Sequence, residues 1–289
     1  MLIDCEKGSA PSSIKSLRIG SAHAGGRYVI SQHNVSLTVD PHLGGRIVSL
    51  TCDGDEVLYT QGDMCGSTFW PSPQNVWHWP PPAAIDNQPY QIEEKDTSFS
   101  ILSSVCPATG LQVRKKIHID KSGCIKISYE MINNSSQDVR FSPWEITRVC
   151  AGGTVFFPQG DDISVSSDLV PTREDSIVWY NRRDNKKKLF RDGLEGWIAH
   201  LAGRHVLIKS WEEDVQPVDF APNEAEIELY SATDYLEVEV QGKYLPMSPG
   251  QTVTWDVYWR LKVVPNTIDT RIGSPALVDF VRKHVGIDS

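Results

Sequence analysis

The stretch Leu111-Gln-Val-Arg-Lys-Lys-Ile-His-Ile119 indicates the kind of fold that this chain adopts. Ile117 and Ile119 alternate with Lys116 and His118, which is the period of a β-strand with one buried face and one wet face. On this pattern His118 is expected to be a surface residue. A second run, at 125–132, predicts another strand.

Short runs of strand character recur along almost the whole chain. They lie at 27–31, 35–39, 46–51, 57–60, 99–105, 139–149, 154–157, 163–167, 197–201, 205–211, 225–231, 235–240 and 252–264. Turn signals such as Asp53-Gly-Asp55 separate them, as in antiparallel hairpins. We expect Pro143 to interrupt the run at 139–149, and the charge run 181–188 to be a solvated loop. Roughly fifteen strands predict an all-β protein, a large antiparallel β-sandwich.

Only the C-terminal tail has a helical period. Ser274 is a capping residue, and Pro275 suits the first helical turn. Leu277, Phe280, Val281 and Val285 fall on one face, and Gly286 follows them. The tail therefore predicts one short C-terminal helix that ends at the glycine.

Composition narrows the function. The 289 residues are 40% hydrophobic and 22% charged, with a net charge of −9, which is typical of a soluble globular protein and unfavourable for binding nucleic acid. We expect a disordered segment at 1–16 and one domain at 17–289. The first residues lack the apolar core of a signal peptide, and no run is long enough to cross a membrane, so a cytoplasmic location is expected. The six cysteines form no Cys-x-x-Cys pair; neither a metal site nor a cofactor is predicted.

The segment 66–82, Gly-Ser-Thr-Phe-Trp-Pro-Ser-Pro-Gln-Asn-Val-Trp-His-Trp-Pro-Pro-Pro, combines five prolines with three of the nine tryptophans. Prolines exclude a helix and remove hydrogen-bond donors from a ladder, so the whole segment is expected to be irregular backbone. Aromatic faces on a stiff loop suit a flat, partly apolar ligand such as a sugar ring. A hydrophobic flap that covers the end of a sheet is the alternative.

Several segments resemble the galactose mutarotase-like superfamily, in particular a bacterial branch of unassigned function that is similar to aldose 1-epimerases. The resemblance spans roughly residues 27–264. The segments that carry it are Gly44-Gly-Arg-Ile47, Gly66-Ser-Thr-Phe-Trp-Pro-Ser-Pro73, Trp77-His-Trp-Pro-Pro81, Arg140-Phe-Ser-Pro-Trp-Glu-Ile-Thr-Arg148, Thr154-Val-Phe-Phe-Pro158, Asp192-Gly-Leu-Glu-Gly-Trp197, Glu224-Ala-Glu-Ile-Glu-Leu-Tyr230, Tyr235-Leu-Glu-Val-Glu-Val-Gln-Gly242 and Ser248-Pro-Gly-Gln-Thr-Val-Thr-Trp255. The resemblance implies a super-sandwich of two large sheets with a carbohydrate-sized cleft on its concave side.

In mutarotases a histidine is the acid on the ring oxygen and a glutamate is the base on the anomeric hydroxyl. Glu239, before Pro249-Gly250, matches the position of the glutamate, and Glu237 on the same strand face is the alternative. Glu145 stands where the histidine is expected. Held protonated by an apolar shell from Trp144, it would still serve as an acid.

Other candidates for sugar contacts come from the loop and from three strands. They are Arg46, Trp70, Gln74, Trp77, His78, Trp144, Arg148, Lys209 and Trp211. Arg46 follows two glycines and offers a bidentate donor, with a surface salt bridge as the alternative. Lys209 and Trp211 share one strand face. Arg148 is expected to lie on the face opposite Glu145.

Three functions remain open on the sequence. The first is a mono- or oligosaccharide-binding protein that interconverts aldose anomers with the carboxylates of Glu145 and Glu239. The second is a sugar-binding or sensing module without catalysis, favoured by the missing histidine. The third is a glycoside hydrolase or lyase that uses the same two carboxylates, which would have to lie about 5 to 9.5 Å apart.

Overall fold

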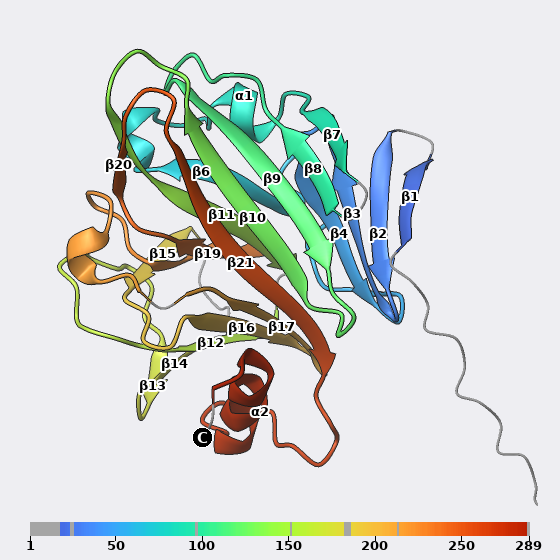
Figure 1. Ribbon diagram of the computed structural model, residues 1–289. Helices are drawn as coiled ribbons and strands as arrows, with labels where there is room; N and C mark the ends of the chain where they lie inside the picture. Colours follow the sequence, from blue (N-terminus) through green and yellow to red (C-terminus); the bar gives the residue numbers. More distant parts are fainter. Residues whose placement is uncertain are drawn as a thin grey trace, which may run out of the picture.

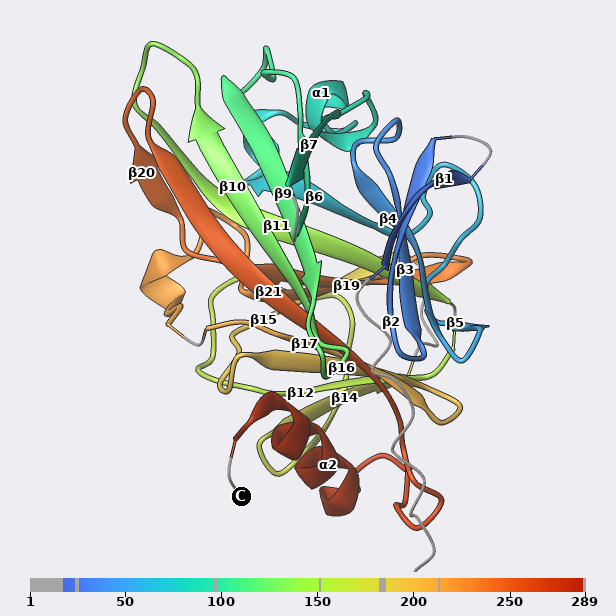
Figure 2. The same ribbon diagram turned by 45° about the vertical axis from the view of Figure 1, so that its right-hand side comes forward.

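The alternating runs of the sequence form two large antiparallel sheets that face each other, with a helix below them (Figures 1 and 2). The protein is described here by a computed structural model covering residues 18–23, 26–95, 98–150, 152–181, 186–212 and 214–287. The expected disordered segment 1–16 lies outside the described residues. The single domain expected at 17–289 stays a prediction.

Sheet A carries the strands that matter for the site. Its order is β1 (Arg18–His23), β2 (Arg27–Gln32), β3 (Val35–Asp40), β4 (Arg46–Cys52), β6 (Ser67–Ser72), β11 (Val139–Cys150), β19 (Tyr235–Gln241), β18 (Ile227–Ser231) and β15 (Lys187–Arg191). The short strands β5 (Asp55–Glu56) and β20 (Leu245–Met247) pair with β4 and β11.

Sheet B has the order β13 (Thr172–Glu174), β14 (Ile177–Asn181), β12 (Thr154–Pro158), β16 (Trp197–Ala202), β17 (His205–Ser210), β21 (Thr252–Val263), β10 (Ile125–Asn133), β9 (Leu111–Ile119), β8 (Ser98–Leu102) and β7 (Gln91–Lys95). The α-helices are α1 (Ala83–Asp86) and α2 (Pro275–Val285), and single 3-10 turns cover Gln74–Val76 and Pro217–Asp219.

The main core lies between the two sheets, as the alternation in β9 predicts. Ile117 and Ile119 are buried in it, whereas His118 is exposed. Phe69 of sheet A stacks on Tyr129 of sheet B with ring centroids 4.8 Å apart, which joins the two layers. The all-β sandwich expected from the sequence is confirmed.

The C-terminal helix covers the outer face of sheet B (Figure 1). Ser274 Oγ accepts a hydrogen bond from the backbone N–H of Leu277 at 3.3 Å, and Gly286 ends the helix with a φ of 94°. Leu277 and Val281 are buried in a second core with Trp197 of β16. The predicted helix, its cap and its end are therefore confirmed.

Some sequence expectations are wrong in detail. No strand is formed at 163–167, and at 57–60 only Leu58 makes an isolated bridge, to Val149. The strands β1, β5, β7, β13, β14, β15 and β20 were not predicted. Most of them are short or lie at sheet edges, where few alternating positions reveal the period.

Two prolines sit inside paired strands, contrary to expectation. Residues 67–72 of the proline-rich segment form β6, and Pro143 does not interrupt β11. Pro71 lies directly opposite Pro143 in this antiparallel pair. The carbonyl of Pro143 accepts a hydrogen bond from the N–H of Gly242 at 3.0 Å, and that of Pro71 accepts one from the indole of Trp77 at 2.6 Å. The N and C=O of each proline therefore point away from the partner strand, so neither ring removes a donor from the β6–β11 ladder.

Candidate functional site

Strand β19 presents different chemistry on its two faces. Leu236, Val238 and Val240 belong to the core between the sheets. Alternation therefore puts Glu237 and Glu239 on the outer face of sheet A. Both acids are buried there, and Glu239 is only 1% exposed. Buried carboxylates need partners, so the neighbouring strands show what this face is built for.

The strands next to β19 supply those partners in register. Glu237 lies opposite Arg148 of β11 on one side and Tyr230 of β18 on the other. Tyr230 in turn lies opposite Lys188 of β15. Because directly opposed residues in an antiparallel sheet share a face, these side chains form one row across four strands.

This face of sheet A carries a pocket of about 480 Å³. It is lined by Met64, Trp70, Gln74, Trp79, Trp144, Lys188, Tyr230, Tyr235, Glu237 and Glu239. Aromatic side chains make up half of this lining, and most of the rest are charged or can form hydrogen bonds. A concave site with apolar walls and a few polar groups is typical of small-molecule binding sites.

Tryptophans form the walls. Trp70 of β6 meets Trp144 of β11 edge to face, with centroids 5.4 Å apart, and meets Trp79 in the same way at 6.0 Å. Trp79 is 59% exposed. Trp77 packs against Trp70 from outside the lining and donates its indole N–H to the carbonyl of Pro71 at 2.6 Å.

A buried aspartate fixes the orientation of Trp70. The indole N–H of Trp70 donates to Asp86 Oδ1 at 2.8 Å, and Arg46 Nη2 donates to the same oxygen at 3.1 Å. Arg46 also donates to the carbonyls of Asp63 and Cys65 and is 1% exposed. The structure thus places Arg46 behind the tryptophan wall rather than in the pocket.

Lys188 is the cation among the described residues that line the pocket. Its Nζ lies 2.5 Å from Glu228 Oε2 and 3.3 Å from Glu239 Oε2. It also lies over the rings of Trp144 and Phe190. Burial disfavours the charge, but the carboxylates of Glu228 and Glu239 raise the pKa of Lys188 above its ordinary value. Lys188 therefore stays an ammonium ion.

The second cation, Arg148, is fully buried beneath the pocket wall. Its Nε donates to Glu237 Oε1 at 2.8 Å, and its guanidinium lies over the rings of Trp70 and Tyr235. Burial raises the pKa of Glu237 to about 6 in spite of Arg148. Glu237 therefore exchanges a proton close to neutral pH.

Two further carboxylates stand behind Lys188. Glu228 Oε1 accepts from the backbone N–H of Ala225 at 2.9 Å and from the amide of Gln241 at 2.7 Å. Glu224 Oε1 accepts from the backbone N–H of Gln74 at 2.9 Å. This hydrogen bond attaches the proline- and tryptophan-rich segment 66–82 to the residues just before β18. Burial raises the pKa of both Glu228 and Glu224.

One oxygen in the pocket is left over. Glu239 Oε1 is buried and accepts no hydrogen bond from the residues that the structure describes. Its other oxygen is engaged by Lys188. A buried carboxylate oxygen without a donor is costly, and a bound group with an N–H or O–H would relieve that cost.

Glu145 does not join Glu239. It lies opposite Val240, so its side chain shares the inner face with the core. Its Oε1 accepts from the indole of Trp259 at 2.8 Å and lies 3.1 Å from Lys209 Nζ. The expected convergence of Glu145 and Glu239 is therefore wrong, because the two residues project from opposite faces of sheet A.

The remaining sequence candidates are divided between the two faces. Lys209 and Trp211 do share a strand face, but it is the inner one, where Lys209 donates to the carbonyl of Val238 at 2.8 Å and Trp211 to Glu226 at 2.7 Å. Arg148 lies on the face opposite Glu145, as expected. Gln74 lines the pocket, whereas His78 is exposed and does not.

Residues 72–262 match the family described as "Domain of unknown function (DUF4380)". This match covers about two thirds of the chain and includes four of the five strands, β11, β15, β18 and β19, whose side chains line the pocket. The chain belongs to the DUF4380 family. No curated protein matches its sequence significantly.

Solved structures show that this DUF4380 chain has the galactose mutarotase-like fold. A galactose mutarotase-like protein from Lactobacillus casei shares 11% identity with a TM-score of 0.59, over 82% of this chain and all of that one. A similarly described protein from Clostridium acetobutylicum shares 9% with a TM-score of 0.57, over 86% and 99%. An aldose epimerase homologue from C. elegans shares 9% with a TM-score of 0.54, over 80% and 97%.

Sequence reasoning about this DUF4380 chain missed the cation of its pocket. Lys188 lies in a charge run that was expected to be a solvated loop, yet residues 187–191 form β15. The signal was the alternation of Lys188 and Phe190 with the buried Leu189, which is too short to stand out. Tyr230 and Tyr235 were missed because aromatic residues in strands are ordinary core residues.

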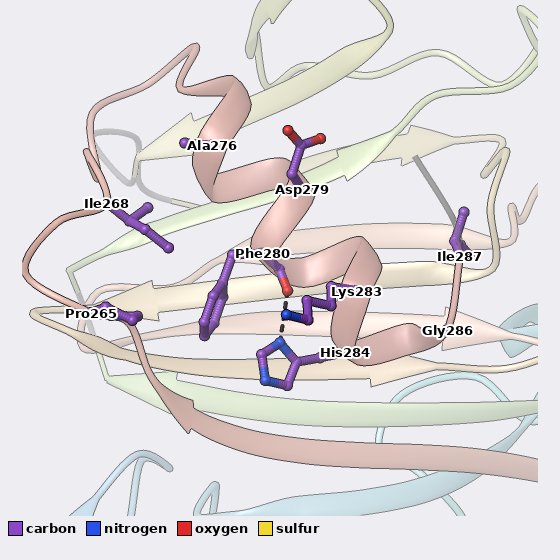
Figure 3. A pocket seen from close by; sticks show the side chains of 9 residues that line it. All are labelled: Pro265, Ile268, Ala276, Asp279, Phe280, Lys283, His284, Gly286 and Ile287. Carbon is purple, nitrogen blue, oxygen red and sulfur yellow. Dashed lines mark hydrogen bonds between the residues drawn. The ribbon is translucent and has the colours of Figure 1, made fainter.

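A larger hollow of about 680 Å³ lies beside α2 (Figure 3). Its wall includes Phe280, His284, Asp279 and Lys283. His284 Nδ1 donates to the carbonyl of Phe280 at 2.7 Å, as the dashed line in Figure 3 shows. Among the described residues around this hollow no buried side-chain nitrogen or oxygen lacks a partner, so we place the candidate site at β19 instead.

Two features are absent from the described part of the chain. No group of three or more His, Cys, Asp and Glu residues has an arrangement that could hold a metal ion. Neither described α-helix has the length and apolar character needed to span a membrane.

Proposed function

We propose that this protein binds a carbohydrate in the pocket at β19. The observation that carries the proposal is the free, buried Oε1 of Glu239 below a wall of tryptophans. A pyranose offers apolar ring faces to Trp70 and Trp144 and hydroxyl donors to the free oxygen. The mutarotase-like fold supports the same assignment, since its relatives include proteins described as galactose mutarotase-like and aldose epimerase homologues.

The chemistry that fits this pocket is interconversion of the two anomers of an aldose. Glu239 would take the proton of the anomeric hydroxyl while the bond between the anomeric carbon and the ring oxygen breaks. The ring oxygen takes the electron pair of that bond and a proton from an acid. Rotation and closure in the reverse direction give the other anomer, with no net gain or loss of protons.

Glu237 is our candidate for the acid. Its pKa of about 6 lets it carry a proton for part of the time at neutral pH, and it lines the same pocket two residues from Glu239. No histidine is among the described residues that line the pocket. Glu237 would thus replace the histidine that the resemblance leads one to expect.

Binding without catalysis is the second candidate. The ion pair between Arg148 and Glu237, at 2.8 Å, engages the acid and favours its charged form over the protonated form that catalysis needs. A glycoside hydrolase that uses Glu145 with Glu239 is not proposed, because the two carboxylates lie on opposite faces of sheet A.

Anomer exchange measured by magnetisation-transfer NMR on a panel of aldoses tests the proposal. We expect accelerated exchange for at least one aldose, and Glu239→Gln should lower it by about 100-fold or more while the affinity for a neutral aldose stays within about tenfold. Glu174→Gln, an exposed residue on sheet B, is the matched control and should behave like the native protein. Binding without acceleration for any aldose would favour the second candidate, and absence of both would refute carbohydrate binding.

A further inference from the structure

The charges around the pocket do not balance. Four carboxylates, those of Glu224, Glu228, Glu237 and Glu239, are buried at or behind its floor. Among the residues that the structure describes, two cations, Lys188 and Arg148, pair with them through the contacts described above. When all six of these groups are ionised, they together carry two more negative charges than positive ones.

The oxygen without a donor belongs to this excess. Glu239 is 1% exposed, lines the pocket, and has one oxygen that no described residue satisfies. Lys188 is held by the other oxygen and by Glu228, so it does not neutralise the free one. A neutral hydroxyl would supply a hydrogen bond there, whereas an ammonium group would supply a hydrogen bond and the missing charge.

The pocket already stabilises one alkylammonium ion. Lys188 Nζ lies 4.8 Å from the ring centroid of Trp144 and 5.2 Å from that of Phe190, between carboxylates. Aromatic faces attract cations, and Trp79 and Tyr230 bring further rings to the pocket lining. Carboxylates beside aromatic rings are the surroundings that a second ammonium ion needs.

The titration of the acids agrees with this charge excess. Burial raises the pKa of Glu228 and Glu224 and brings the pKa of Glu237 to about 6, although Lys188 and Arg148 oppose the shift. The resident cations therefore do not fully compensate for the burial of these carboxylates. A cationic ligand would add compensation that the described residues do not provide.

We propose that the carbohydrate bound by this pocket is an amino sugar, whose protonated amine is recognised by Glu239; this rests on the carbohydrate-binding function proposed above. An amine on the carbon next to the anomeric centre would lie beside the group that Glu239 is proposed to deprotonate. The free oxygen of Glu239 has two lone pairs, enough for the anomeric hydroxyl and the neighbouring ammonium.

The test compares matched ligands on the full chain. D-Glucosamine and D-galactosamine are titrated against D-glucose and D-galactose, with N-acetyl-D-glucosamine as the uncharged nitrogen compound and tetramethylammonium as the cation without a sugar. Calorimetry gives the affinities, and the fluorescence of the pocket tryptophans provides a second readout. We expect an amino sugar to bind at least tenfold more tightly than its neutral parent and than the acetylated form, at pH 7 and low salt.

Variants then locate the effect. Glu239→Gln should reduce the ratio between the amino sugar and its parent to about one, because the amide keeps the shape and loses the charge. Glu174→Gln should leave the ratio unchanged. Unaltered preference in Glu239→Gln would overturn the assignment to Glu239 and with it the inference.

The outcomes separate this inference from the proposal on which it rests. Equal affinity for an amino sugar and its neutral parent would overturn the inference and leave carbohydrate binding in place. Tight binding of tetramethylammonium with no binding of any sugar would overturn carbohydrate binding, and the amino sugar with it. Failure of every ligand to bind would overturn both.

Discussion

Glu145→Gln is the substitution whose effect follows most directly from the fold. Glu145 is fully buried between the sheets and holds Lys209 Nζ at 3.1 Å and the indole of Trp259 at 2.8 Å. The amide removes the charge that opposes Lys209 but preserves the shape. Lys209 is then a buried ammonium without its ion-pair partner, and loss of one partner from such a pair costs about 3–5 kcal/mol.

The titration of Lys209 sets a ceiling on that cost. In the variant, Lys209 can lose its proton instead of staying buried as an ion. An unperturbed lysine has a pKa of about 10.4, so at pH 7 its deprotonation costs about 1.4 kcal/mol for each of the roughly three pH units between 7 and that pKa. The ceiling is therefore about 4 to 5 kcal/mol. Since the unfolded chain then binds more protons than the native one, the penalty of Glu145→Gln should shrink by about 1.4 kcal/mol per pH unit between pH 7 and 9.

Guanidinium unfolding followed by tryptophan fluorescence measures this penalty. Lys209→Met should cost a similar amount, and Glu145→Gln combined with Lys209→Met should cost about 2 kcal/mol or more below the sum of the two single variants. Because Glu145 faces the core, the folded variant should retain sugar binding. A penalty below about 1 kcal/mol, additive costs, or selective loss of anomer exchange in a folded Glu145→Gln would each refute this reasoning.

Two other predictions concern stability. The raised pKa of Glu237 means that its contribution to stability is complete below pH 4 and is lost as the pH rises through about 6, by about 2 kcal/mol in all. Glu237→Gln should remove that part of the pH dependence in unfolding experiments between pH 4 and 7, and an identical dependence in both proteins would contradict the assignment. Ser274→Ala removes the cap of α2 and should cost about 1 kcal/mol, whereas Ser274→Asp should cost little; equal losses in both would show that capping is not what Ser274 contributes.

The sequence predicts the architecture because alternation is a local signal repeated many times. In β9 each buried isoleucine is followed by a polar residue, so the strand can be recognised without knowing its partners. The helix cap at Ser274 is local in the same way. Neighbouring residues alone determine the structure that such a local pattern forms, which is why the predicted sandwich and C-terminal helix are confirmed.

The site is harder to predict because it depends on which face of a strand becomes the pocket. Glu145 and Glu239 both lie in strands of sheet A, but the register puts Glu145 opposite Val240 and so on the inner face. A shift of one residue along a strand moves a side chain to the opposite face of the sheet, and so decides whether an acid lines the pocket or forms an ion pair in the core. Lys188 was missed for the complementary reason: its partners Glu228 and Glu239 lie 40 and 51 residues further along the chain, and no local pattern reveals them.

The two faces of β19 also bear on how this protein could acquire new specificities. Glu239 lies between Val238 and Val240, and both valines are packed in the core between the sheets. A change that displaces β19 at the floor of the pocket therefore also disturbs the packing of the sandwich. Trp79, by contrast, is 59% exposed and lies on a connecting segment. Substitutions at the rim of the pocket, such as at Trp79, should therefore change ligand preference with less loss of stability than substitutions at its floor, such as at Glu239.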